Sequence, residues 1–175
     1  MKRRIAICTT VLLLIATASN AQTPLKEYKA GHVFYVSLPA YMNKTTGINS
    51  SSTIQYKSVV KDVYGFIIED SKEELQLAEM NFASINEFYE DFIGDFLKDE
   101  EKRQVSEPKY QKKGDINFAE ADLTYFDKDA EAEIYYLVGI VETSTTFYKV
   151  LSWSTAENKD KFKADFQKIL YSLRD

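Results

Sequence analysis

Two carboxylates lie close together within a mostly apolar stretch of the chain. Glu120 and Asp122 fall two residues apart in the segment 116–126. Glycoside hydrolysis needs two carboxylic acids about 5 to 10 Å apart across a cleft, with their pKa values driven apart. The pair makes a carboxylate-dependent glycan hydrolase one hypothesis for this chain, although its 27 Asp and Glu residues offer many other pairs.

A second acidic pattern follows directly along the chain. Asp127, Asp129 and Glu131 alternate through a polar segment, and oxygen ligands at this spacing suit a hard cation such as calcium. Ala132, however, stands where a calcium loop needs its glycine, and the bidentate Glu that closes such a loop does not follow. We therefore interpret the segment as an acidic hairpin turn and expect no cofactor, with these three acids as the alternative metal ligands.

Other groups that break bonds are scarce. His32 is the only histidine and Cys8 the only cysteine of the sequence. The G-x-S-x-G, H-E-x-x-H, G-x-x-x-x-G-K-[ST] and G-x-G-x-x-G motifs do not occur. Acyl transfer through Ser or Cys, zinc hydrolysis and nucleotide chemistry are therefore disfavoured, and we expect a protein that is not an enzyme.

Alternating apolar residues predict six strands that would position these groups. The predicted strands cover residues 33–38, 54–60, 63–68, 116–126, 134–141 and 147–153. Short links between several of them favour antiparallel pairing. In the fourth strand the apolar residues pass from even to odd positions, which predicts a β-bulge near Phe118.

Three capping-box spacings predict where helices begin. They are Ser71 with Glu74, Ser84 with Glu87, and Ser154 with Glu157. The last two precede apolar stripes of helical period. Because several strands are apolar on both faces and need cover on both sides, the predicted fold class is α/β (α+β). We expect a three-layer α/β/α sandwich with a largely antiparallel central sheet of about six strands and three helices.

The start of the chain has the pattern of a signal peptide. Lys2, Arg3 and Arg4 precede an apolar run over residues 5–16, and small residues follow up to Ala21. The run is too short to cross a bilayer, and Cys8 would leave with it, so no lipid anchor is expected. The predicted organisation is a signal peptide over 1–21, a flexible segment over 22–32 and a single domain over 33–175, in a periplasmic or secreted protein.

The charge balance limits the partners. The formal net charge of −5 becomes more negative once the basic signal peptide is removed. An acidic surface repels nucleic acid and anionic lipid. We therefore expect no nucleic-acid partner. We also expect no membrane insertion after signal cleavage, and a monomer.

The order of these elements resembles the PsbP-like superfamily. The resemblance rests on a strand that leads into Leu38-Pro39 and on the closing pattern Phe166, Ile169, Ser172 and Leu173. The stretch from Pro39 through Lys44 is also similar to the opening of uncharacterised exported proteins from Gram-negative bacteria. That superfamily includes extrinsic subunits of photosystem II and small periplasmic proteins, so the resemblance implies a non-enzymatic accessory domain. Some members are associated with metal ions, but the histidines implicated in plant members have no counterpart in this sequence.

These observations favour an exported, non-enzymatic binding or accessory module that recognises a protein or envelope component. The predicted contact surface is the loop 40–53, with Tyr41, Met42, Lys44 and Asn49 as ligand-binding candidates. The alternative for this loop is that Tyr41 and Met42 simply pack over a helix. The alternatives for function are the glycan hydrolase and a structural assembly subunit, which would carry an apolar patch on an exposed helix face.

Overall fold

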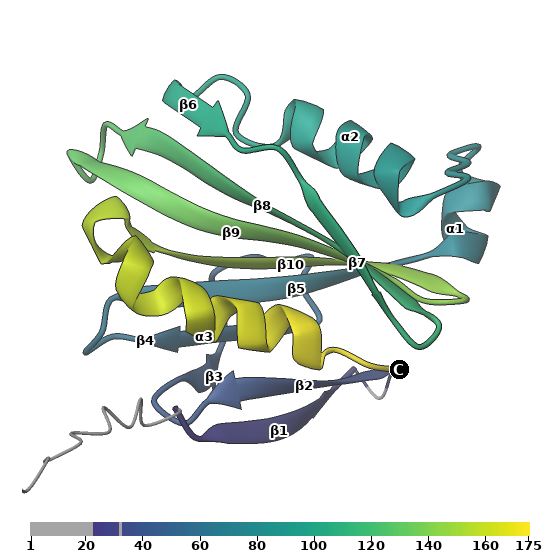
Figure 1. The fold of residues 1–175 in the computed structure, drawn as a ribbon, viewed down its shortest axis with the longest axis horizontal. Coiled ribbons are helices and arrows are strands. Elements are labelled where there is room, and N and C mark those ends of the chain that lie inside the picture. The colour runs from purple at the N-terminus through teal and green to yellow at the C-terminus, as the bar shows by residue number, and fades with distance from the viewer. Residues whose placement is uncertain (1–22, 32) are drawn as a thin grey trace, which may run out of the picture.

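Ten strands and three α-helices make up the part of the chain that the computed structural model describes, residues 23–31 and 33–175 (Figure 1). The strands are β1 Leu25–Ala30, β2 Phe34–Pro39, β3 Asn43–Thr45, β4 Ile54–Ser58, β5 Val63–Ser71, β6 Glu101–Val105, β7 Lys109–Lys113, β8 Ile116–Asp127, β9 Ala132–Glu142 and β10 Thr146–Thr155. The helices are α1 Lys72–Leu77, α2 Ile85–Asp95 and α3 Lys159–Ser172, with a short 3-10 helix at Ala156–Asn158. The predicted signal peptide and His32 lie outside the described residues.

The fold is a mixed α/β arrangement in which every strand pair is antiparallel. β1 and β2 form a small sheet, and the larger sheet has eight strands in the order β3-β4-β5-β10-β9-β8-β6, with β7 also paired to β8. The six predicted strands are confirmed as β2, β4, β5, β8, β9 and β10. The larger sheet has eight strands where a central sheet of about six was expected, and the predicted strand β2 lies in the small sheet instead. The strands β1, β3, β6 and β7 were not predicted.

The four missed strands share a physical cause. Each lies at an edge of its sheet, and their residues are mostly exposed. An edge strand with little buried surface carries charged residues instead of an apolar alternation. Within the segment 22–32 that was expected to be flexible, Leu25–Ala30 forms a strand that pairs along its whole length with β2.

Two apolar clusters lie on opposite faces of the larger sheet. Along β9, Tyr135, Leu137 and Val141 belong to the cluster that contains α3 and β2, whereas Tyr136 and Val138 belong to the cluster that contains α2. Successive side chains of a strand point to opposite faces. α3 and the small β1-β2 sheet therefore cover one face, and α2 covers the other (Figure 1). No helix among the described residues is long and apolar enough to cross a membrane.

The predicted bulge in β8 is absent. The register between β8 and β9 runs without a shift from Asn117 opposite Glu142 to Asp127 opposite Ala132. Phe118 faces α3, and Ala119 faces α2 on the other side of the sheet. The apolar pattern changes phase because the positions that follow Phe118 on the α3 face are occupied by acids. A strand covered on both sides can be apolar in either phase.

Two of the three predicted helix starts are confirmed. The Ser71 hydroxyl accepts the Glu74 N–H at 3.5 Å, and the Ser84 hydroxyl accepts the Glu87 N–H at 3.3 Å. The third is wrong, since Ser154 extends β10 and its hydroxyl donates to the carbonyl of Thr155. α3 begins later, at Lys159 after the 3-10 turn.

Candidate functional site

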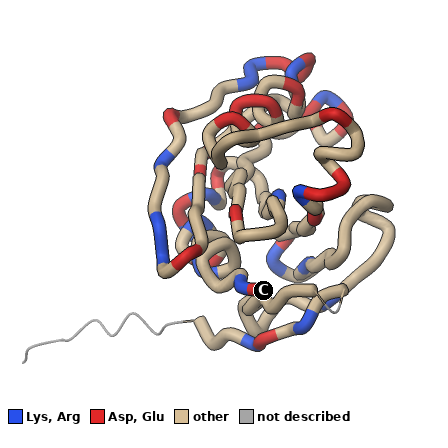
Figure 2. Tube along the Cα trace, turned by 90° about the vertical axis from the view of Figure 1, so that its right-hand side faces the viewer, with Lys and Arg blue, Asp and Glu red and all other residues tan. Residues whose placement is uncertain are grey.

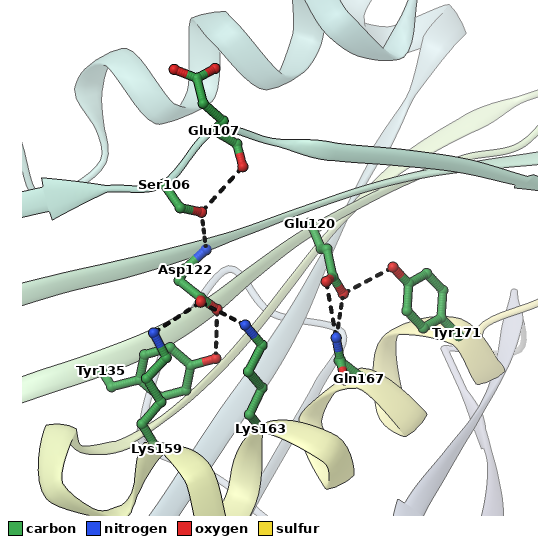
Figure 3. Close-up of polar contacts among 9 residues, drawn as sticks. All are labelled: Ser106, Glu107, Glu120, Asp122, Tyr135, Lys159, Lys163, Gln167 and Tyr171. Atoms are coloured by element: carbon green, nitrogen blue, oxygen red, sulfur yellow. Dashed lines mark hydrogen bonds and ion pairs between the residues drawn. The ribbon is translucent and has the colours of Figure 1, made fainter.

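A row of polar side chains on α3 faces the acids of β8. Lys159, Lys163, Gln167 and Tyr171 are spaced four residues apart, so they share one side of the helix. Glu120 and Asp122 are two residues apart, so they share one face of β8. The four side chains of α3 contact the two acids of β8, and we call these six residues the polar seam (Figure 3).

Asp122 is the more strongly bound of the two acids. Its carboxylate accepts hydrogen bonds from Lys163 at 2.6 Å and from the Tyr135 hydroxyl at 2.9 Å, and the ammonium group of Lys159 lies 2.9 Å away (Figure 3). Burial alone would raise the pKa of Asp122. The hydrogen bonds from these three groups outweigh burial and lower the pKa below its ordinary value.

Glu120 is buried, with 4% of its surface exposed, and it is held by neutral donors. The Gln167 amide donates to both carboxylate oxygens, at 2.9 and 3.2 Å, and the Tyr171 hydroxyl donates at 2.9 Å (Figure 3). Burial, and then the hydrogen bond to Glu120, raise the pKa of Tyr171. These contacts satisfy the carboxylate without any ammonium group within salt-bridge distance in the described part of the chain.

A glycine allows α3 to lie close to the sheet at this point. Gly139 of β9 is the cross-strand partner of Glu120. A Cβ atom at Gly139 would overlap the side chain of Leu170, which is fully buried on α3. Because Leu170 occupies the space above Gly139, its helix neighbours Gln167 and Tyr171 reach Glu120.

An open groove of about 590 Å³ lies between β7 and α3. Lys109 and Gln111 of β7 form one side, Ala164 and Lys168 of α3 form the other, and Glu120 lies among the residues that line it. Lys109 is directly opposite Glu120 in the β7-β8 pairing. The groove therefore combines a buried carboxylate with exposed cationic and amide side chains, which suits a polar ligand that makes hydrogen bonds and ion pairs.

The two acids do not converge in this groove. Glu120 lines it, but Asp122 does not, because its carboxylate is directed to Lys159 and Lys163. A hydrolase with two carboxylates requires both acids to face the same bound sugar. With only one of the two acids in its lining, the groove has the features of a binding site and lacks the paired acids of a two-acid catalytic site.

The loop 40–53 is placed differently from the contact surface that the sequence predicts. Tyr41 is half-buried and its hydroxyl donates to Asp165 of α3 at 2.9 Å, which raises the pKa of Tyr41 together with burial, the larger cause. Met42 has 1% of its surface exposed and belongs to the core. The expectation of an exposed Met42 is therefore wrong. The arrangement corresponds to the alternative in which both residues pack over a helix.

The other two loop candidates remain at the surface without forming a shared site. Lys44 is exposed on β3, and its ammonium group lies 5.6 Å from the ring centre of Tyr28. Asn49 organises its own turn, since its side-chain oxygen accepts the Ser51 N–H and its carbonyl accepts the Gln55 amide. A role of Tyr41, Met42, Lys44 or Asn49 in binding stays a prediction.

The acids at the end of β8 and directly after it form the predicted hairpin turn. Asp127 Oδ1 accepts backbone N–H groups from Asp129 at 2.9 Å and Ala130 at 3.0 Å, and Glu131 adopts a positive φ of 51°. Asp127 pairs with Ala132 across the turn. Within residues 23–31 and 33–175, no three His, Cys, Asp or Glu side chains are grouped as metal ligands.

Sequence reasoning found Glu120 and Asp122 but missed their partners. Gln167 and Tyr171 lie in the last predicted helix, outside its apolar stripe. The signal that could have found them is the four-residue repeat that begins at Lys159. The groove itself needs β7, which the apolar pattern did not predict.

The element order, the antiparallel sheet and the position of the last helix define a PsbP-like fold. The solution structure of cyanobacterial PsbP (CyanoP) from Synechocystis sp. PCC 6803 superposes with a TM-score of 0.61 and 10% identity, covering 97% of this chain and 98% of that chain. No protein-family model matches this sequence, and no curated protein matches it by sequence.

Two further solved structures share the fold. One is LpqN of Mycobacterium tuberculosis, described as involved in cell envelope biogenesis, with a TM-score of 0.57, 8% identity and coverage of 86% of this chain and 89% of that chain. The other is a Pseudomonas aeruginosa protein of unknown function, PA94, with a TM-score of 0.53, 8% identity and coverage of 86% and 96%. At these identities the likeness concerns the fold.

Proposed function

We propose that this chain is an exported, non-enzymatic binding module that recognises a protein or another envelope component through the groove between β7 and α3. The observation that carries the proposal is the groove of about 590 Å³ beside Glu120, whose carboxylate is buried and held by Gln167 and Tyr171. A site built on a strand and a helix, lined by exposed Lys109 and Gln111, offers directed contacts to a polar partner.

The surroundings of the groove support this proposal. α2 and α3 pack on opposite faces of the sheet, as in the three-layer sandwich we propose, so the groove wall on α3 is fixed by the core. The solved structures with this fold include a protein described as involved in cell envelope biogenesis. A periplasmic or secreted location follows from the sequence pattern of residues 1–21 and is part of the proposal.

The test is retention of the purified protein on envelopes isolated from its own host. Replacing Ala164 by Trp fills the groove from an exposed position on α3 without removing a polar contact. Ala78→Trp is the matched control, because Ala78 is exposed at the end of α1 and away from the groove. We expect saturable retention of the parent protein and of Ala78→Trp, and its loss in Ala164→Trp. Equal retention of both variants would refute the proposal.

The same preparation tests the hydrolase alternative. Envelope glycan carrying a reducing-end label is incubated with the parent protein and with the Glu120→Gln and Asp122→Asn variants. We expect no release of labelled product above the protein-free sample. If the parent protein releases labelled product and either variant does not, the hydrolase hypothesis is supported and the proposal of a non-enzymatic binding module is refuted.

A further inference from the structure

The outer edge of β7 is unpaired. β7 runs from Lys109 to Lys113, and every one of its residues is exposed. It pairs with β8 on one side, and no described strand pairs with it on the other. A strand of this kind presents free backbone N–H and C=O groups that can pair with an added strand.

The edge is held in place by a tight turn. β7 and β8 are joined through Gly114 and Asp115, and Lys113 pairs with Ile116. Gly114 has a φ of +61°, and a glycine at the first central position is typical of a type II′ hairpin turn. β8 is an interior strand of the larger sheet, and its pairing with β7 keeps the backbone of β7 extended. The unpaired edge of β7 therefore has the conformation that an added strand requires.

Three of the five β7 residues are lysines, on an acidic protein. Lys109, Lys112 and Lys113 have no carboxylate within salt-bridge distance among the described residues. Figure 2 shows blue segments along this strand at the left-hand edge of the view. A second copy of the chain would place lysines against lysines here, so self-pairing is disfavoured. The charge complements an acidic strand.

From these observations the geometry points to a specific partner: an extended, acidic polypeptide segment that adds to the sheet along β7. This inference rests on the proposed function and names the partner class for the same groove. Lys109 and Lys113 face α3, as Glu120 and Ile116 opposite them do, whereas Lys112 faces the other side. A segment that pairs antiparallel to β7 therefore carries acids at positions i, i+1 and i+4, opposite Lys113, Lys112 and Lys109. The residue opposite Lys109 extends its side chain toward the groove and Lys168.

The probe is a fluorescent synthetic peptide of about eight residues, a common strand length, built from alternating threonine and valine. Three glutamates occupy the positions that face Lys113, Lys112 and Lys109. One control peptide has the same composition with the glutamates moved to other positions. A second control keeps the sequence but is N-methylated at alternate residues, which blocks backbone pairing and leaves the charge unchanged.

We expect anisotropy to show binding of the patterned peptide that weakens with added salt, and about tenfold weaker binding of both controls. The Lys112→Glu/Lys113→Glu variant should also bind about tenfold more weakly. Lys26→Glu/Lys29→Glu, on the exposed edge strand β1, makes the same change of charge elsewhere and should bind like the parent. Amide hydrogen exchange of alternate β7 residues should slow in the complex.

Equal binding of the N-methylated peptide, or unchanged exchange along β7, would overturn strand addition. Absence of binding by the patterned peptide would overturn the acidic partner. If either occurs while Ala164→Trp still abolishes envelope retention, the groove remains a binding site and only the partner class fails. If Ala164→Trp leaves retention unchanged, the proposed function fails first.

Discussion

Glu120 of β8 is paired in register with Gly139 of β9, so a buried carboxylate lies beside the one β9 position that has no side chain. Leu170 of α3 fills the space above Gly139, and the helix thereby comes close enough for Gln167 and Tyr171 to bind Glu120. Packing and polar contacts at this point depend on each other.

A Cβ atom at Gly139 should therefore weaken the attachment of α3. Gly139→Ala forces buried Leu170 to move, and overpacking of this kind costs about 1–3 kcal/mol. Urea unfolding followed by circular dichroism measures the loss. Gly94→Ala is the matched control, because nothing lies within 4 Å of the added Cβ and alanine favours the helix by about 0.5–1 kcal/mol. Equal stability of the two variants would contradict the close approach of α3.

The seam should make stability depend on pH through Asp122. The folded-state pKa of Asp122 is lowered, so on acidification the unfolded chain takes up this proton first. The ionised Asp122 therefore stabilises the folded state fully above the ordinary pKa of about 4, and this contribution is lost as the pH falls through the lower folded-state pKa.

The measurement compares the free energy of unfolding of the parent and Asp122→Asn between pH 7 and pH 2. We expect a large difference at neutral pH that narrows below about pH 4. Asp95→Asn removes a carboxylate from an exposed pair with Lys98 and should change stability little at any pH. A constant difference for Asp122→Asn would argue against an ionised Asp122 in the seam.

Buried tyrosines should limit stability at high pH. Burial is the main cause that raises the pKa of Tyr89, Tyr125 and Tyr148 to about 12. A raised folded-state pKa stabilises the fold below the ordinary value of about 10, and this contribution is lost as the pH rises toward 12.

Tyrosinate absorbance measures this effect directly. In denaturant all 12 tyrosines should titrate near pH 10, whereas in the folded protein only a fraction should do so and the rest should ionise together with unfolding. Tyr135→Phe removes one group whose pKa is raised by burial and by Asp122, so the free energy of unfolding of this variant should decline less steeply with rising pH than that of the parent. If the variant and the parent lose stability equally with pH, the buried position of Tyr135 is contradicted.

The loop 40–53 can be tested by one pair of truncations. Met42→Ala removes a core side chain and should cost about 2–5 kcal/mol, whereas Lys44→Ala at the exposed surface should change stability by less than about 0.5 kcal/mol. Thermal and urea unfolding check both values. A small effect of Met42→Ala would restore Met42 as a candidate for ligand contact.

The interior of this fold was predictable from the sequence, and its edges were not. The six strands with at least one buried face were found because burial imposes an apolar pattern on them, and β7 was missed because exposed Lys109 and Lys112 carry no such pattern. The same rule applies to the site. Glu120 stood out as an acid in an apolar strand, but Gln167 is an ordinary surface type on a helix, and only the packing of α3 brings the two together.

The polar seam also favours one position of α3 along β8. Its four-residue repeat advances about 6 Å along the helix axis, close to the roughly 6.6 Å between alternate residues of β8, so a helix slipped by one repeat would still meet both acids. Such a slip would bring Gln167 to Asp122 and carry Lys159 beyond it, so that the acid would lose one of its two cations. Because the side chains at the repeat positions of α3 differ, only one alignment of the helix on β8 gives each acid its own partners. Apolar side chains of similar kind would distinguish poorly between such alignments.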